Sequence, residues 1–511
     1  MPQAAAVVVA VVIFTLLYDP FHVSALVFLA LTPITLVFAN PSWECSLPRA
    51  AAFGFAFGLA AAMAIVGPWM YGASVDYFGH GAMWSLGFTL LVNAGYVALF
   101  QVPAFVAIRL LAFTPPVVRV FGAASVWTTF EMLRASDPAG NSWALLGQAF
   151  AYLPVLREAA AYGGEPLLGW AAALCGAAVG VGLQPDLNTF ASRICMSIGV
   201  AAPLSLALLG GNEHWRDQEI SPLQPLRVAV VQAEIASRDV WNPAQRLTHW
   251  NTYISATETI PAGSVDLVVW PESAAPFLLD ADAASRARLA DLAKSIGAAI
   301  LLGAPRTESS GEGRASLFNS AYFFAPGAAG PRTYDKQRLL PYVENSPIAG
   351  SEVPDTADYR AGTSAEWFEV RGWRISPLLC FEAVYPQYAR DAVLGGAGLL
   401  VNLSNDAWFA GGAGPEQHYA MSRMRAAELR RPMVRASNGG VSGAIGPDGE
   451  EIGFPIHRHK AVGIYQIPSP SRRMTLAATM PNLIPVLAGL IAAIAVFYGL
   501  RRWWTEEAPE A

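Results

Sequence analysis

Apolar residues are distributed unevenly along this chain of 511 residues. Residues 1–215 consist of long apolar runs without a single lysine, residues 216–470 carry most of the charge, and a run without charged residues follows from Met474 to Leu500. Because a helix needs about 20 apolar residues to cross a bilayer, this pattern predicts three regions. They are a transmembrane bundle at 1–215, an aqueous domain at 216–470, and a transmembrane helix with a short tail at 471–511.

The apolar runs predict about eight transmembrane helices. Seven lie near residues 4–17, 24–39, 50–70, 84–111, 117–134, 165–183 and 192–210, and the eighth lies near 477–500. Arginines occur in alternate connections, and the positive-inside rule then places both chain ends in the cytoplasm and residues 211–476 outside it. The arginines that set this orientation are Arg49, Arg109, Arg119, Arg193, Arg501 and Arg502, whereas Arg134 and Arg157 run against it.

The aqueous region alternates strand-like and helix-like segments. Four short runs are typical of buried strands, and two longer ones have helical periodicity with charged outer faces. The strands are Leu226–Gln232, Val265–Trp270, Ala298–Leu302 and Leu399–Asn402, and the helices are Ala281–Ile296 and Pro415–Arg430. Near-continuous apolar strands between helices indicate an α/β domain whose sheet is buried on both faces.

Composition supports the prediction of a membrane protein and bears on the kind of partner that it binds. The hydrophobic fraction is 54% and the charged fraction 14%, and the mean hydropathy is +0.36, values typical of a membrane protein. The net charge of −6 gives no indication of a nucleic-acid partner.

Cys380 is the one cysteine of the aqueous region; Cys45, Cys175 and Cys195 lie in the membrane region. It ends an apolar run that contains Pro377, a residue tolerated at a sheet edge or bulge. A thiol at a strand end can be held rigidly against a cleft, which suits a nucleophile. The alternative is a small, inert core residue.

Two further side chains follow strand-like segments. Glu272, in Trp270-Pro-Glu-Ser273, lies between a buried strand and an apolar run, where partial desolvation would raise its pKa toward the range of a general base. Its alternative is a helix-capping acid. Lys336 lies among aromatic and apolar residues and could stabilise an oxyanion, or could be an ordinary surface lysine like Lys294 and Lys460.

Polar residues also follow strands at Asn402–Phe409 and Met433–Gly440, which indicates either the rim of a site or ordinary turn chemistry. A cysteine protease would need a histidine partner, and none of the histidines in the aqueous region follows a strand as Glu272, Lys336 and Cys380 do. Apart from His457-Arg-His459, which reads as a charged loop, no Cys/His cluster suggests a metal site, and neither a metal nor a cofactor is expected.

Glu272, Lys336 and Cys380, in this order and each after an apolar strand, resemble the Glu-Lys-Cys triad of the nitrilase superfamily. With membrane spans on both sides of the domain, the chain resembles the apolipoprotein N-acyltransferase family from about residue 20 to residue 500. Trp127–Arg134 and Trp143–Gln148 in the membrane region are similar to patterns of that family. The resemblance implies an αββα sandwich domain on the periplasmic side of the bacterial inner membrane.

The resemblance also implies a ping-pong acyl transfer. Glu272 would take the thiol proton, Cys380 would accept an acyl group from a membrane phospholipid as a thioester, and Lys336 would hold the oxyanion. The α-amine of a diacylglyceryl-cysteine apolipoprotein would then take the acyl group. Trp241 would lie on a mobile loop at the cleft mouth, and Glu344 and Glu382 would be supporting carboxylates.

Two positions depart from the family pattern. Phe381 follows the cysteine where some members have tyrosine, and Glu234 stands where asparagine is usual. The alternatives to an acyltransferase are a membrane-tethered nitrilase or amidase acting on small carbon–nitrogen substrates and a non-catalytic, lipoprotein-binding relative. The membrane-region motifs count against the first, and the intact triad counts against the second.

Overall fold

The computed structural model of the chain describes residues 2–136, 140–216, 222–236, 239–240, 242–309, 315–340, 343–344, 359–409 and 412–507. The chain divides into two compact units. A helical unit comprises Met1–Arg216, Gly412–Ala420 and Thr475–Ala511, and an α/β unit comprises Asp217–Gly411 and Met421–Met474. The short segment Gly412–Ala420 thus packs with the helical unit although it lies within the predicted aqueous region.

A helix is found at each apolar run of the helical unit. The helices are α1 (Pro2–Leu17), α2 (Thr32–Phe38), α3 (Leu47–Ile65), α4 (Gly67–Gly72), α5 (Ala82–Asn93), α6 (Leu99–Leu110), α7 (Pro116–Ala135), α8 (Pro154–Glu158), α9 (Ala160–Gly182), α10 (Thr189–Arg216), α15 (Leu476–Thr479) and α16 (Leu483–Glu507). The helix α9 is mostly buried inside the unit, whereas α10 and α16 expose most of their apolar surface, as helices facing lipid do.

Five of the described helical segments are long and apolar enough to cross a membrane: Leu47–Ile65, Ala82–Phe113, Ala160–Gly182, Thr189–Arg216 and Leu483–Thr505. Pro2–Leu17 and Ser24–Phe38 are apolar but shorter. A membrane protein is therefore supported, but the predicted count of about eight spans is not confirmed.

The α/β unit contains two six-stranded sheets, as the fold resemblance predicts, in place of the single sheet that the pattern alone suggested. The first has the strand order β12-β1-β2-β3-β4-β5 and the second β11-β10-β9-β8-β7-β6. The strands are β1 (Leu226–Gln232), β2 (Leu267–Val269), β3 (Ala299–Ser309), β4 (Ala315–Phe324), β5 (Arg332–Asp335), β6 (Phe368–Val370), β7 (Trp373–Leu379), β8 (Leu399–Asn405), β9 (Met433–Asn438), β10 (Val441–Ile445), β11 (Glu451–His457) and β12 (Ala461–Ile467).

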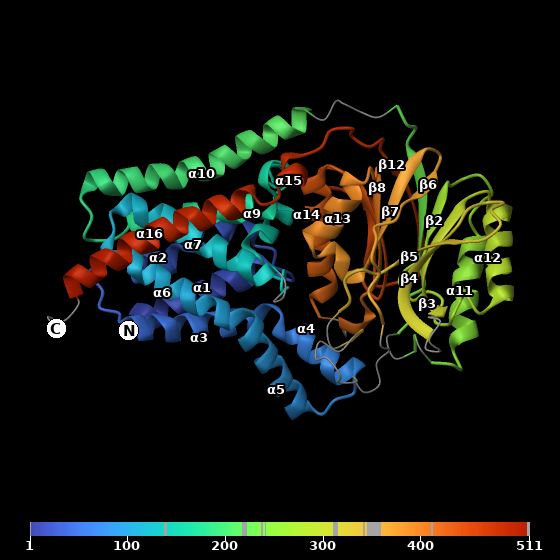
Figure 1. Cartoon of the computed structure of the whole chain (residues 1–511), viewed down its shortest axis with the longest axis horizontal. Coiled ribbons are helices and arrows are strands. Elements are labelled where there is room, and N and C mark those ends of the chain that lie inside the picture. Colours follow the sequence, from blue (N-terminus) through green and yellow to red (C-terminus); the bar gives the residue numbers. More distant parts are fainter. Residues whose placement is uncertain are drawn as a thin grey trace. The chain divides into compact units, whose positions relative to one another are not determined.

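Helices cover the outer faces of the two sheets, which gives an αββα sandwich (Figure 1). The first sheet carries α11 (Arg246–Glu258) and α12 (Ala283–Ile296), and the second carries α13 (Pro386–Leu394) and the residues Met421–Leu429 of α14 (Gly414–Leu429). One buried core, with Val230, Leu301, Ile375 and Val401, lies between the sheets. A second, with Trp250, Trp270 and Leu289, lies between the first sheet and its helices. The central strands β1, β2, β8 and β9 are thus buried on both faces, which explains their continuous apolar sequences.

Each sheet is parallel in its centre and antiparallel at its margins. The strand β2 runs parallel to β1 and β3, and β8 runs parallel to β7 and β9. Pro377 lies in β7 beyond the short strand β6, which pairs only with Trp373–Ile375. The missing N–H of Pro377 therefore costs no ladder bond to β6, as the edge or bulge interpretation expected.

Candidate active site

Glu272 lies just past β2, where the chain turns through Trp270 and Pro271. Its side chain is buried, and each carboxylate oxygen has a fixed partner. The Asn319 amide donates to Oε1 at 2.7 Å, and the backbone N–H of Asn405, at the end of β8, donates to Oε2 at 3.1 Å. The glutamate is thus held at the carboxyl ends of one strand from each sheet.

Lys336 follows β5 directly and is also buried. Its Nζ donates to Glu272 Oε1 at 3.1 Å and to Glu344 Oε1 at 2.9 Å. Its backbone N–H donates to the Asn319 carbonyl at 2.8 Å. The lysine is therefore a buried cation between two carboxylates and not a surface residue.

Cys380 follows β7 at the start of a short 3-10 turn, Cys380–Ala383. Its backbone has a φ of +50°, a region that non-glycine residues seldom occupy. The Asn402 side-chain amide donates to the Cys380 carbonyl at 3.2 Å and to the Leu378 carbonyl at 3.0 Å. A strained conformation at the end of a strand, fixed by its neighbour, is typical of a functional site.

The charges of these groups are strongly coupled. Burial raises the pKa of Glu272, and the charge of Glu344 adds to this, while Lys336 opposes it. Burial alone would lower the pKa of Lys336, but the charges of Glu272 and Glu344 outweigh burial and raise it well above the ordinary value. Burial and the charge of Glu272 raise the pKa of the Cys380 thiol, and Lys336 acts against them. The resting cysteine is therefore a thiol beside a carboxylate whose raised pKa suits a general base.

Glu382 joins the segments that carry the lysine and the cysteine. Its Oε1 accepts hydrogen bonds from the Tyr334 hydroxyl at 2.8 Å and from the backbone N–H groups of Gln337 and Arg338 at 2.6 and 3.2 Å. Its Oε2 accepts from the backbone N–H of Leu379 at 2.6 Å. Burial raises the pKa of Glu382 to about 7, against these bonds, which lower it. The carboxylate therefore ties the residues after Lys336 to the residue before Cys380.

Glu382→Gln is expected to lower the free energy of unfolding by about 1–3 kcal/mol, because a buried donor loses its acceptor. In either orientation the amide nitrogen of glutamine would face an N–H or O–H that now donates to a carboxylate oxygen. Thermal unfolding of the purified chain measures the effect, and the exposed Glu369→Gln in β6 is the matched control, expected to change stability by less than about 0.5 kcal/mol. Equal unfolding midpoints for the two variants would contradict this role.

The other expected site residues are placed as follows. Glu344 is buried beside Lys336, and its Oε2 accepts from the Leu340 backbone N–H at 2.7 Å. The Phe381 ring is mostly buried and lies 6.0 Å from the Trp408 ring, between centroids. Trp241, expected at the cleft mouth, lies outside the described residues.

Glu234 has a φ of +54°, and its Oε2 accepts a hydrogen bond from the Gln232 side chain at 2.9 Å. Asparagine tolerates this left-handed conformation better than glutamate does. This backbone preference accounts physically for the asparagine that the family resemblance leads us to expect there.

Sequence reasoning missed Asn319. This residue lies within β4, and its amide nitrogen donates to Glu272 Oε1 at 2.7 Å and to Glu344 Oε1 at 2.6 Å. The only signal in the sequence is an asparagine inside a strand, where this residue type is depleted. Among the residues that the structure describes, no group of three or more His, Cys, Asp or Glu side chains could hold a metal ion.

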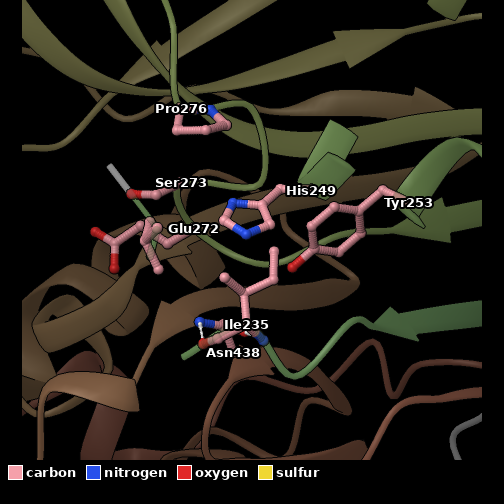
Figure 2. Close-up of a pocket in the computed structure, with 8 residues that line it drawn as sticks. Ile235, His249, Tyr253, Glu272, Ser273, Pro276 and Asn438 are labelled. Atoms are coloured by element: carbon pink, nitrogen blue, oxygen red, sulfur yellow. Dashed lines mark hydrogen bonds between the residues drawn. The ribbon is translucent and has the colours of Figure 1, made fainter. Parts of the chain in front are cut away.

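A narrow cavity without room for a water-sized molecule lies behind the glutamate, lined by residues that include His249, Tyr253, Ser273 and Asn438. Figure 2 shows the Glu272 carboxylate directed away from the His249 and Tyr253 rings. The cavity therefore adjoins the stem of this side chain, and the carboxylate is left to its contacts with Lys336, Asn319 and Asn405.

Comparison with known protein families finds a match for two parts of the chain. Residues 227–475 match the carbon-nitrogen hydrolase family, and residues 10–178 match the apolipoprotein N-acyltransferase N-terminal domain. The chain is 30% identical over 462 residues to apolipoprotein N-acyltransferase of Pseudomonas paraeruginosa, which covers 85% of this chain and 87% of the relative. This chain belongs to the apolipoprotein N-acyltransferase family.

Other members of the apolipoprotein N-acyltransferase family show the same extent of similarity. The Azotobacter vinelandii protein is 31% identical over 440 residues, covering 84% of this chain and 82% of the relative. The Brucella suis protein is 29% identical over 465 residues, covering 88% and 84%. Among solved structures, a CN-hydrolase superfamily protein from Xanthomonas campestris is 22% identical with a TM-score of 0.36, covering 48% of this chain and 91% of that one.

Proposed function

We propose that this chain N-acylates the N-terminal diacylglyceryl-cysteine of apolipoproteins, with a membrane phospholipid as acyl donor. One observation carries this proposal. A chain of the apolipoprotein N-acyltransferase family keeps a buried carboxylate, ammonium and thiol, Glu272, Lys336 and Cys380, each after a strand of its carbon-nitrogen hydrolase domain. We further propose that the α/β unit faces the periplasm at the bacterial inner membrane, where lipids could reach the site from the bilayer.

In the first half-reaction Glu272 takes the proton of the Cys380 thiol as the sulfur attacks the ester carbonyl of the phospholipid. Lys336 neutralises the oxyanion that forms, and a preorganised, buried cation is well suited to this task. Collapse of the intermediate breaks the ester bond. The lysophospholipid leaves with the proton from Glu272, and the acyl group stays on Cys380 as a thioester.

In the second half-reaction the α-amine of the lipoprotein attacks the thioester. Glu272 accepts a proton from the amine, the carbon–sulfur bond breaks, and the thiolate of Cys380 takes the proton back. The product is an amide, and the enzyme returns to its starting state. A thiol suits both steps because it is a good nucleophile and a good leaving group.

The thioester is the feature that tests this function. We expect the purified chain, incubated in detergent with phospholipid and no acceptor, to gain the mass of one fatty acyl chain. The gain should be lost after hydroxylamine, map to the peptide with Cys380, and be absent from Cys380→Ala. Intact-mass spectrometry makes each comparison.

Two controls sharpen the result. Cys175→Ala, in the helical unit, should gain the acyl chain as the wild type does. Addition of a diacylglyceryl lipopeptide should remove the acyl group and yield an N-acylated lipopeptide. A folded wild-type chain that takes up no acyl group but hydrolyses a small amide would instead be an amidase, and one that does neither would be a binding protein.

A further inference from the structure

A second buried polar cluster lies beneath Cys380, on strands β8 and β9. In the parallel ladder Leu379 of β7 pairs with Leu403 of β8, so the next position brings Ser404 beside Cys380. On the other side Ser404 pairs with Ser437 of β9. The side chain of Ser404 is fully buried, so its hydroxyl hydrogen-bonds with groups of the protein.

An ion pair without solvent exposure anchors this cluster. Arg435 Nη2 donates to Asp406 Oδ2 at 2.5 Å, and both side chains are 0% exposed. The Ser437 hydroxyl donates to the same oxygen at 2.9 Å, and the Ser404 hydroxyl donates to Asp406 Oδ1 at 2.7 Å. A Cβ on Gly440 would lie 2.4 Å from Asp406 Oδ2, so the chain leaves no room for a side chain there.

Two observations connect this cluster with Cys380. Arg435 donates to the Asn402 side-chain oxygen, and the Asn402 amide in turn donates to the Cys380 carbonyl. Both Ser404 and Asp406 also act on the sulfur, since the Ser404 hydroxyl lowers the pKa of the thiol and the charge of Asp406 raises it. The hydroxyl has a single proton, which it donates to Asp406 Oδ1. The strand register sets Cys380 beside it, so a thiolate there would be a second acceptor.

We propose that Ser404 is a positioning residue whose hydroxyl turns from Asp406 to the sulfur of Cys380 when the thiolate forms. The proton of the thiol passes to Glu272, and the hydroxyl proton stays on Ser404 and only changes its acceptor. Asp406 keeps Arg435 and Ser437 as partners throughout, so it remains paired while the serine turns. The proposal rests on Cys380 being the nucleophile of the proposed function, but its test needs no lipid substrate.

The test is the rate at which iodoacetamide alkylates Cys380 in the full chain, measured by peptide mass spectrometry from pH 6 to pH 10. Ser404→Ala should displace the rising limb of this profile upward by about one pH unit, because the thiolate loses a donor. At a given pH the rate should fall about three- to tenfold, the smaller value allowing for the greater nucleophilicity of a more basic thiolate. Asp406→Asn should displace the limb downward, because it removes a negative charge near the sulfur.

Opposite displacements distinguish this role from a loss of packing, which would expose the thiol and speed alkylation in both variants. Ser376→Ala is the matched control, since this buried hydroxyl lies in β7 and donates to the Glu366 carbonyl at 2.9 Å. Its profile should match the wild type. An unchanged or downward-displaced profile for Ser404→Ala would overturn the proposal. Displaced profiles in a chain that never forms an acyl-enzyme would leave the positioning role intact and refute the acyltransferase instead.

Discussion

Lys336→Met is expected to slow formation of the acyl-enzyme about a hundred- to a thousandfold, the loss typical of removing a preorganised oxyanion partner. The substitution also removes the ammonium that Glu272 and Glu344 share at 3.1 and 2.9 Å. Two carboxylates joined to one Asn319 amide would then repel each other, and one would take up a proton. A general base that already holds a proton cannot accept one from Cys380. The variant would therefore lose the general base as well as the oxyanion partner.

Single-turnover acylation, followed by intact mass, measures this effect. Lys294→Met on the exposed face of α12 is the matched control and should acylate at the wild-type rate. The unfolding midpoint of Lys336→Met must be recorded as well, because breaking a buried ion pair costs about 3–5 kcal/mol. Acylation of a folded Lys336→Met within tenfold of the wild type would show that the lysine has no part in the chemistry.

The strand pattern was sufficient to find two of the three main groups of the candidate site. Glu272 and Cys380 follow the apolar strands β2 and β7, as predicted, whereas Lys336 follows β5, whose residues Arg332–Asp335 are mostly polar. The predicted strand Leu226–Gln232 agrees with β1 to the residue. Chain-local signals succeed here because a strand end fixes the position of the residue that follows it.

Side-chain contacts that depend on strand order and register could not be predicted from the strand pattern. Asn319 contacts Glu272 and Glu344 only because β4 lies between β3 and β5, which no local pattern indicates. Asp406 and Arg435 were recognised only as members of polar segments after strands. Their pairing depends on the alignment of β8 with β9, in which Asn402 faces Arg435.

The segment Gly412–Ala420 shows that composition also failed to predict the unit to which a segment belongs. The segment is polar, so its composition predicted part of the aqueous region. In the structure Gln417 is buried in the helical unit, where its side-chain oxygen accepts from the indole N–H groups of Trp69 at 3.2 Å and Trp143 at 2.6 Å. Three residues from distant parts of the chain satisfy one another, and composition alone cannot reveal such an arrangement.

Arg435→Met is expected to lower the free energy of unfolding by about 3–5 kcal/mol, because Asp406 would stay buried without its cation. For a domain of this size the midpoint of thermal unfolding should fall by about 6–20 °C. Arg288→Met is the matched control: this arginine pairs with Glu258, and both side chains are about half exposed. Exposed pairs contribute less than about 1 kcal/mol, so the control should unfold close to the wild type.

The double variant Arg435→Met/Asp406→Leu separates the pair's net contribution from the cost of leaving one charge unpaired. With both charges removed, no buried ion lacks a partner, and apolar side chains of similar volume often replace such a pair at little cost. The double variant should therefore be more stable than Arg435→Met alone, although Ser404 and Ser437 lose their common acceptor. If it regains stability while alkylation of Cys380 keeps the wild-type pH profile, the pair serves folding only. If it regains stability and the profile is displaced, the pair also sets the position of the Ser404 hydroxyl.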